Sequence, residues 1–509
     1  MLAVAHSAAV LGVDGYVVRV EAHSSAGTPN FSIVGLPDRA LGESRERVRA
    51  AIHNCGFAFP PGKLLVNLSP ADVRKEGPGF DLAIALALLS LDEQIKPDAL
   101  RPFVVLGELA LDGRLRAVRG VLPMALGARA GAITRVMVPV ENAPEASLVD
   151  GLSVYGVAHL ADAVAVLAGH GDKFRHVPAP ALESPAAADR GDFSDVHGQA
   201  TAKRALEIAA AGGHNVLLVG PPGCGKTMLA QRLPSILPAM NRDEALDVTR
   251  IHSAAGLLAG GGVIAARPFR APHHTISSTA LVGGGSTPRP GEISLAHGGV
   301  LFLDEFGEFH RSALEALRQP LEDGAVTIAR ANATLTFPAR FTLVVALNPC
   351  PCGLRGSRTG DCRCDDATIA KYLAKLSGPL LDRIDMHVEL ARVPFDELLA
   401  QRPGEPSAAI RNRVEAARAR QTKRFAGRTM PTNAAIAARE LRHLAPLDGN
   451  AAALLRRAAA RGTLSARALD RIVRVARTIA DLAAAPEVGV EHLSEAILYR
   501  VGDRPTVAA

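Results

Sequence analysis

The residues best suited to chemistry form a glycine-rich loop between an apolar run and a helix-forming run. They read G-x-x-x-x-G-K-T and comprise Gly220, Pro221, Pro222, Gly223, Cys224, Gly225, Lys226 and Thr227. In this pattern the backbone N–H groups surround nucleotide phosphates, and the following helix adds the positive end of its dipole. We expect Lys226 to reach the β- and γ-phosphates of ATP and Thr227 to bind Mg²⁺. A chance glycine-rich turn is the weaker alternative in this strand–loop–helix context.

Two acids follow a second apolar run, about eighty residues further on. Residues 300–303 predict a buried strand, and Asp304 and Glu305 stand at its end. We expect Asp304 to hold Mg²⁺ through water and Glu305 to orient the attacking water. A third strand, expected over residues 341–347, ends at Asn348. Its amide could position the same water, although taken by itself a simple turn residue is the better interpretation of Asn348.

Two arginines could supply positive charge to a phosphoryl-transfer transition state. Arg383 lies between Asp382 and Asp385, and Arg467 opens a helical pattern near the C-terminus. On chemistry alone, ordinary surface salt bridges are the favoured explanation for both arginines.

Four cysteines are clustered in the chain. They are Cys350, Cys352, Cys362 and Cys364. Four thiolates can form a tetrahedral Zn²⁺ site, and we expect one here. Unligated thiols or a labile redox pair are the alternatives. The adjacent His273 and His274 do not share a strand or helix face, so we expect hydrogen-bonding or packing roles for them.

The length of the chain, 509 residues, suggests about three domains to position these residues. Residues 1–175 mix strand-like runs (16–22, 63–69, 103–111 and 134–140) with helical stretches, as in an α/β or α+β domain. Residues 176–192 are rich in Pro and Ala and are expected to form a linker. An α/β core over 193–393 and a helical domain over 394–509 follow.

Composition limits the partners and the compartment. The chain is 48% hydrophobic, carries a formal charge of +6 and has 4% aromatic residues without Trp. These values permit binding to a phosphate backbone and argue against a broad base-stacking platform. Apolar runs are too short to span a membrane, and the N-terminus lacks a basic signal region. We therefore expect a cytoplasmic protein without a membrane partner.

Several motifs together resemble the magnesium-chelatase-like AAA+ ATPases, in particular the YifB/ComM family. They are the phosphate loop, Asp304-Glu305, Asn348 with the following PCPCG, and SGPLLDRIDMHVE. The resemblance implies a P-loop ATPase core with a C-terminal helical lid. It also implies that Asn348 is sensor 1, Arg383 an arginine finger and Arg467 sensor 2. A finger that reaches a neighbouring subunit implies a homo-oligomeric ring, expected to be a hexamer.

The N-terminal domain resembles the proteolytic domain of Lon, over residues 75–89, 107–121 and 136–142. Lon-type proteolysis uses a Ser–Lys dyad. The matching positions hold Gly79 and Leu122, which cannot perform that chemistry. The resemblance therefore implies a scaffold or nucleic-acid-binding module.

Three functions fit such an ATPase. It could move along DNA, it could remodel a metal-inserting protein partner, or it could be an assembly factor that is controlled by nucleotide and does not translocate. Of these loads we favour DNA. As the resemblance to the YifB/ComM family suggests, we expect a DNA helicase or translocase that acts on branched DNA in recombination or natural transformation. A hairpin is expected over residues 323–341, and glycine-rich insertions over 255–271 and 283–291. Their candidate DNA contacts are Arg330, Asn332 and Arg340 in the hairpin and Arg267, Arg270 and Arg289 in the insertions. Solvated loop charges are the alternative.

Overall fold

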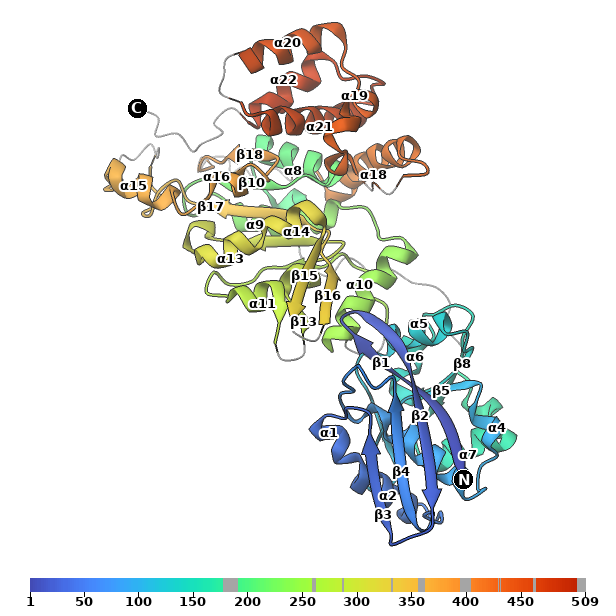
Figure 1. Ribbon diagram of the computed structural model, residues 1–509. Coiled ribbons are helices and arrows are strands. Elements are labelled where there is room, and N and C mark those ends of the chain that lie inside the picture. Colours follow the sequence, from blue (N-terminus) through green and yellow to red (C-terminus); the bar gives the residue numbers. More distant parts are fainter. Residues whose placement is uncertain are drawn as a thin grey trace. The chain divides into compact units, whose positions relative to one another are not determined.

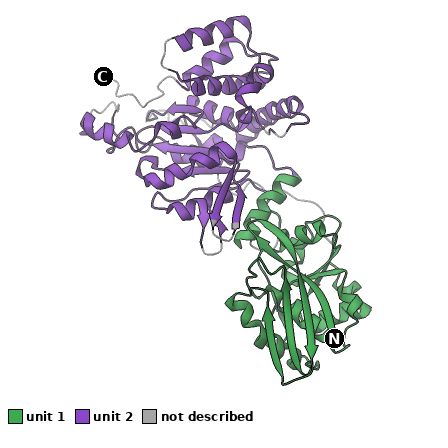
Figure 2. Ribbon diagram, viewed as in Figure 1, with its two compact units in different colours: residues 1–183, 242–264 green, residues 184–241, 265–509 purple. Residues whose placement is uncertain are grey.

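The computed structural model describes most of the chain. The described residues are 1–176, 191–258, 262–285, 288–330, 333–355, 362–393, 404–428, 430, 432–460 and 464–500. The chain forms two compact units (Figure 2), an N-terminal unit of residues 1–183 and 242–264 and an ATPase unit of residues 184–241 and 265–509. The predicted linker lies outside the described residues except at its ends, and so does the start of the predicted helical domain at 394–403.

Within its described residues, the N-terminal unit is built on a seven-stranded mixed sheet of order β3-β4-β2-β1-β5-β8-β9 (Figure 1). The strands are β1 Leu2–Leu11, β2 Asp14–Ser25, β3 Asn30–Val34, β4 Lys63–Ser69, β5 Phe103–Val105, β8 Arg135–Pro139 and β9 Ser153–Val157. Strands β1, β2 and β4 pair antiparallel, and β1, β5, β8 and β9 pair parallel. The predicted strands at 16–22, 63–69 and 134–140 are confirmed, whereas the run 103–111 divides into β5 (Phe103–Val105) and β6 (Glu108–Leu109), which belong to different sheets.

Helices cover both faces of this sheet because successive strand residues point to opposite sides. One face packs against α2 (Ser44–Asn54) and α3 (Asp81–Leu91). Every residue of α3 is buried. The other face packs against α5 (Val121–Ala130), which in turn contacts α10 (Arg242–Ala255). Helix α10 therefore packs with the N-terminal unit although it follows the phosphate loop in the chain.

Smaller elements complete the N-terminal unit. They are α1 Arg39–Gly42, α4 Pro97–Leu100, β6 Glu108–Leu109, β7 Leu115–Arg116, α6 Ala143–Ala146 and α7 Leu160–Ala165. Gly79 lies in a 3-10 turn just before α3, and Leu122 is buried in the first turn of α5. Neither position carries a nucleophile or a base.

The ATPase unit has a parallel sheet of order β11-β14-β17-β10-β18 among its described residues. The strands are β11 Phe269–Arg270, β14 Val300–Leu303, β17 Thr342–Leu347, β10 Val216–Val219 and β18 Met386–Glu389. Strands β10, β14 and β17 confirm the three apolar runs. An antiparallel hairpin of β15 (Ala325–Arg330) and β16 (Ala333–Pro338) confirms the expected hairpin.

The C-terminal helices share one hydrophobic core with this sheet. Helix α18 (Ser407–Arg424) packs on α8 (Ala200–Gly212) and on α9 (Lys226–Ile236), the helix after the phosphate loop. The other C-terminal helices are α19 Leu441–Leu444, α20 Gly449–Ala460, α21 Ala466–Leu482 and α22 Val490–Leu498. Beyond residue 403 the described residues form no regular strand, as predicted. The remaining elements are α11 Ser278–Val282, β12 Gly283–Gly284, β13 Arg289–Pro290, α12 Glu292–Leu295, α13 Arg311–Ala316, α14 Arg318–Asp323, α15 Asp366–Leu373 and α16 Gly378–Leu381.

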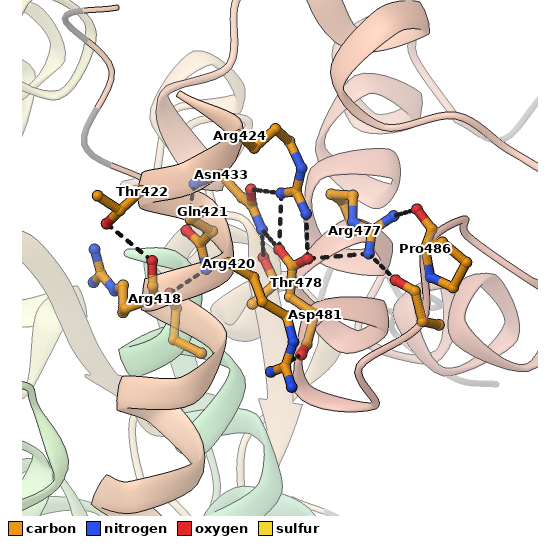
Figure 3. A network of polar contacts seen from close by, with 12 residues as sticks. Arg418, Arg420, Gln421, Thr422, Arg424, Asn433, Arg477, Thr478, Asp481 and Pro486 are labelled. Atoms are coloured by element: carbon orange, nitrogen blue, oxygen red, sulfur yellow. Dashed lines mark hydrogen bonds and ion pairs between the residues drawn. The ribbon is translucent and has the colours of Figure 1, made fainter. Parts of the chain in front are cut away.

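A buried polar network joins α18, α21 and the turn between them (Figure 3). The carboxylate of Asp481 is fully buried and accepts hydrogen bonds from Arg424, Arg477 and Asn433. Asn433 also donates to Thr478, and its backbone N–H donates to Gln421. Because each buried charge faces an opposite charge or a hydrogen-bonding partner, the network fixes the register of these helices.

No helix among the described residues is long and apolar enough to cross a membrane.

Candidate nucleotide-binding site

The predicted site residues meet at one edge of the ATPase sheet. Strand β10 leads into the phosphate loop, β14 into Asp304 and β17 into Asn348. These three strands are parallel, and Val219 at the end of β10 is in register with Leu347 at the end of β17. Parallel strands place their carboxyl ends at a common edge, where doubly wound α/β proteins bind ligands.

Lys226 lies inside the phosphate loop. Its Nζ donates to the carbonyl oxygens of Gly220 at 2.6 Å and Pro221 at 3.0 Å, and to Asn348 Oδ1 at 3.1 Å. Burial lowers the pKa of Lys226. The ammonium is thus held by neutral oxygens, and phosphate oxygens entering the loop would be stronger acceptors.

Two candidate Mg²⁺ ligands lie side by side. Thr227 Oγ1 donates to Asp304 Oδ2 at 2.7 Å, and Asp304 Oδ1 accepts from the backbone N–H of Glu305 at 2.9 Å. Hydroxyl and carboxylate oxygens are the hard ligands that Mg²⁺ prefers, so this pair fits the ion. Both side chains line a cavity of about 300 Å³ that Glu305 and His274 also line.

Glu305 has an unusual backbone conformation and a basic neighbour. Its φ is 52°, in the left-handed region that non-glycine residues rarely adopt. Its Oε2 lies 3.1 Å from Nδ1 of His274. His273 instead contacts Thr275 Oγ1 at 3.0 Å. His274 thus has the hydrogen-bonding role expected of this pair.

Comparisons of the sequence with protein families and with curated proteins identify the family. Residues 192–398 match the family described as magnesium chelatase, subunit ChlI, residues 20–142 match subunit ChlI of Mg-chelatase, and residues 404–500 match the subunit's C-terminal family. An uncharacterized protein YifB of Salmonella typhimurium is 44% identical over 513 residues, covering 99% of this chain and 98% of that protein. The chain belongs to the YifB/ComM family of magnesium-chelatase-like AAA+ ATPases.

Other relatives extend this result. The competence protein ComM of Haemophilus influenzae is 44% identical over 504 residues, covering 98% of this chain and 97% of that protein. An uncharacterized protein of Mycobacterium tuberculosis is 47% identical over 498 residues, covering 97% and 98%. A Lon protease of Salinispora arenicola is 29% identical over 177 residues, which is 32% of this chain and 22% of the protease. The predicted family and the predicted Lon similarity are confirmed.

The two arginines assigned by resemblance to the YifB/ComM family differ in environment. Arg383 is buried, forms an ion pair with Glu322 and donates to the carbonyl oxygen of Pro379 at 2.5 Å. Arg467 is exposed in the first turn of α21. In this single chain, Arg383 therefore faces inward, and a contact with a neighbouring subunit would require its ion pair with Glu322 to open.

The four clustered cysteines converge. Their sulfur atoms all lie within 4.8 Å of one another. Cys350 Sγ lies 3.3 Å from Cys352 Sγ and 3.8 Å from Cys362 Sγ, and Cys352 Sγ lies 3.6 Å from Cys362 Sγ. Four sulfurs about 2.3 Å from one Zn²⁺ would be about 3.8 Å apart.

The basic insertions are only partly available to a ligand. Arg267 donates to the carbonyl oxygens of Pro238 and Gly298, and Arg270 forms a bidentate pair with Glu292 at 2.6 and 2.7 Å. These two arginines were expected to contact DNA, but they serve the fold of the ATPase unit.

The other candidate DNA contacts have different positions. Arg289 and Arg340 are exposed. The side chain of Arg330 and the whole of Asn332 lie outside the described residues. Exposed cationic candidates are therefore found beside the hairpin and on β13.

Three partners of the site were not found from the sequence. Gln199 donates to the carbonyl oxygen of Cys224 in the phosphate loop at 3.0 Å. Glu322 pairs with Arg383, and Tyr372 of α15 packs against Gly307, two residues after Glu305. Each is distant in sequence from its partner, and none forms part of a short motif.

Proposed function

We propose that this chain is a ring-forming, ATP-hydrolysing motor that acts as a DNA helicase or translocase on branched DNA in recombination or natural transformation. The observation that carries the ATPase part is the meeting of Lys226, Thr227, Asp304, Glu305 and Asn348 at one sheet edge. The full-length similarity to a competence protein supports the DNA part.

In this proposal each residue of the edge has one task. The N–H groups of the phosphate loop and Lys226 bind the β- and γ-phosphates of ATP. Thr227 and Asp304 hold Mg²⁺, which neutralises charge on the phosphates. Glu305 orients the attacking water and accepts its proton, and Asn348 places the same water in line with the γ-phosphate.

The remaining charge comes from arginines in the proposed ring. Arg383 reaches the nucleotide of a neighbouring subunit after leaving Glu322, and Arg467 responds to nucleotide in its role as sensor 2. Six subunits are the expected number. The expected compartment is the cytoplasm.

The proposed DNA contacts are phosphate contacts. Arg289 and Arg340 are exposed cations in the ATPase unit, and Arg330 lies at the tip of the hairpin. The sequence has 15 Phe, 4 Tyr and no Trp, so base stacking contributes little and sequence preference is weak. The logarithm of affinity therefore falls linearly with the logarithm of salt concentration.

We also infer that Cys350, Cys352, Cys362 and Cys364 hold one structural Zn²⁺. The support is the sulfur spacing, which suits tetrahedral coordination. Elemental analysis of freshly reduced protein checks this, with about one zinc per chain expected. Replacing both Cys352 and Cys364 with Ser should lower the zinc content.

A second candidate is a chelatase-type motor that remodels a protein partner. The family descriptions, which name a magnesium chelatase subunit, favour it. The two functions differ in what stimulates hydrolysis. DNA should stimulate the first and leave the second unchanged.

The test measures ATP turnover and strand movement with forked and four-way junctions, single strands and duplex. Wild type should be stimulated by DNA and should process a junction. Lys226→Ala should lose nucleotide binding, whereas Glu305→Gln should bind ATP but turn over about 10²-fold more slowly. Arg289→Ala should reduce the salt slope by about one unit and uncouple strand movement from hydrolysis. If no DNA binds at low salt and no junction is processed, the partner-remodelling function is favoured instead.

A further inference from the structure

The cysteine cluster joins two segments that each contact the nucleotide site. Cys350 and Cys352 follow β17, just beyond Asn348, whereas Cys362 and Cys364 immediately precede α15. Residues 356–361 between the two pairs lie outside the described residues. A metal bound by all four thiolates would therefore fix the end of β17 to the start of α15.

The first segment packs on the phosphate loop. Gly353 has φ of 77°, and its backbone N–H donates to the carbonyl oxygen of Cys350 at 2.9 Å. A Cβ added to Gly353 would lie 2.6 Å from Cδ of Pro222. Since real Cβ atoms do not approach so closely, only glycine allows this turn to contact the phosphate loop without a shift.

The second segment packs beside Glu305. Tyr372 of α15 is 5% exposed, and its hydroxyl end lies against Gly307, two residues after Glu305. A Cβ added to Gly307 would lie 2.5 Å from that hydroxyl oxygen. Lys375, just after α15, donates to the carbonyl oxygen of Gly307 at 3.1 Å. Helix α15 thus holds the backbone that immediately follows Glu305.

We propose that the cysteine cluster is a metal-dependent clamp on the ATP site, which holds Asn348 against the phosphate loop and α15 against the segment after Glu305. This role rests on the zinc site proposed above. When the metal leaves, the thiolate cross-link is lost, the ion pair of Arg355 with Asp366 at 3.2 Å is left between the described parts of the two segments, and both contacts loosen. Nucleotide affinity and turnover therefore depend on the metal, although the metal does not touch the nucleotide.

The test uses the full-length protein and two independent perturbations. In the first, a chelator removes zinc, and Cys352→Ser with Cys364→Ser prevents its rebinding. In the second, Gly353→Ala keeps all four thiolates but pushes on Pro222. Zinc content, affinity for a fluorescent ATP analogue, turnover and tryptic cleavage between residues 350 and 375 are measured for each. Cys55→Ser and Gly378→Ala are the matched controls, because Cys55 lies in the N-terminal unit and a Cβ on Gly378 would have nothing within 4 Å.

We expect zinc removal to weaken analogue binding and turnover about tenfold, to expose residues 350–375 to trypsin, and to be reversed by added Zn²⁺. Gly353→Ala should retain zinc yet weaken analogue binding about tenfold, because the strained turn must move. Zinc-free protein that keeps its fold, its analogue affinity and its turnover would overturn the clamp while leaving the zinc site intact. Protein that never contains zinc would overturn both, and neither result bears on DNA stimulation, which is measured separately.

Discussion

His274 Nδ1 lies 3.1 Å from Oε2 of Glu305, the carboxylate proposed to orient the attacking water. Both side chains line the cavity that also contains Thr227 and Asp304. A carboxylate held by an imidazole cannot use the same lone pairs to position water. The contact therefore restrains one oxygen of Glu305, and we expect basal hydrolysis to rise when this restraint is released.

Removing this restraint should raise basal hydrolysis. Exposed ion pairs contribute about 0.2–1 kcal/mol, so His274→Ala should increase basal ATP turnover by up to about fivefold. It should also reduce the additional stimulation by DNA, because less restraint is left to release. Steady-state ATPase assays with and without DNA measure both effects. His53→Ala is the control, since His53 is exposed on α2 of the N-terminal unit, whereas the ring of His273 packs on that of His274 with centroids 4.1 Å apart. Lower turnover in His274→Ala would mean that the histidine places Glu305 for catalysis.

The buried position of Arg383 gives a second prediction. Its ion pair with Glu322 must open before it can reach a neighbouring nucleotide. Arg383→Ala and Lys226→Ala should each be inactive alone, but mixing them should restore part of the ATPase activity. In some mixed interfaces, an intact Arg383 then faces an intact Lys226.

Two further measurements test the location of Arg383. Glu322→Gln should ease the release of the arginine and preserve complementation, whereas Arg383→Lys should lose the planar contact. A strictly monomeric protein with full ATPase activity would contradict a role between subunits.

Local sequence patterns were sufficient for the centre of the ATPase unit. Strands β10, β14 and β17 are short apolar runs, and each ends directly at a residue of the site. Strand β1 was not predicted, because its run LAVAHSAAVL is rich in alanine, which has low strand propensity. It forms a strand because it pairs along its whole length with β2 and buries one face on α3.

Other features depend on partners that are distant in the chain. Arg383 pairs with Glu322, which is 61 residues away in the sequence, and Arg270 pairs with Glu292, which is 22 residues away. No local pattern indicates which arginines pair inside the protein and which stay exposed. The packing of α10 on the N-terminal unit could not be predicted either, because its amphipathic pattern does not indicate which surface its apolar face covers.

The buried Asp481 gives a prediction of stability. Asp481→Ala would leave Arg477, which is 1% exposed, without its counter-charge, and would also remove an acceptor from Arg424 and Asn433. Breaking a buried pair from one side costs about 3–5 kcal/mol, so the free energy of unfolding should fall by about that amount. Urea unfolding followed by circular dichroism measures it. Glu487→Ala, at an exposed position after α21, should change it by less than about 0.5 kcal/mol.

Glu145 of α6 joins α10 to α5 within the N-terminal unit. Its Oε1 accepts hydrogen bonds from Ser253 Oγ of α10 at 2.5 Å and from the backbone N–H of Leu122 at 2.9 Å. Leu122 is buried in the first turn of α5, so the contact lies between helices. Two exposed ion pairs, Arg242 with Asp150 and Arg250 with Asp14, flank the contact. The buried carboxylate is 4% exposed, so it contributes more to docking than the flanking pairs.

Glu145→Ala should release α10 from this surface. It leaves two donors without their acceptor, the Leu122 N–H and the Ser253 hydroxyl, which should lower the free energy of unfolding of the N-terminal unit by about 3 kcal/mol. Glu145→Gln keeps an acceptor oxygen and should cost less than about 1 kcal/mol, while Glu141→Ala at an exposed position is the control.

Faster tryptic cleavage at Arg242 and Arg250 should accompany the loss in Glu145→Ala, whereas basal ATPase should be retained because the phosphate loop belongs to the other unit. Residues 242–264 leave the ATPase unit after α9 and re-enter it before β11, so a loosened α10 should reduce DNA-stimulated hydrolysis if the N-terminal unit communicates with the ATP site. Equal protease resistance in Glu145→Ala and Glu145→Gln would show that α10 is held by its apolar face alone.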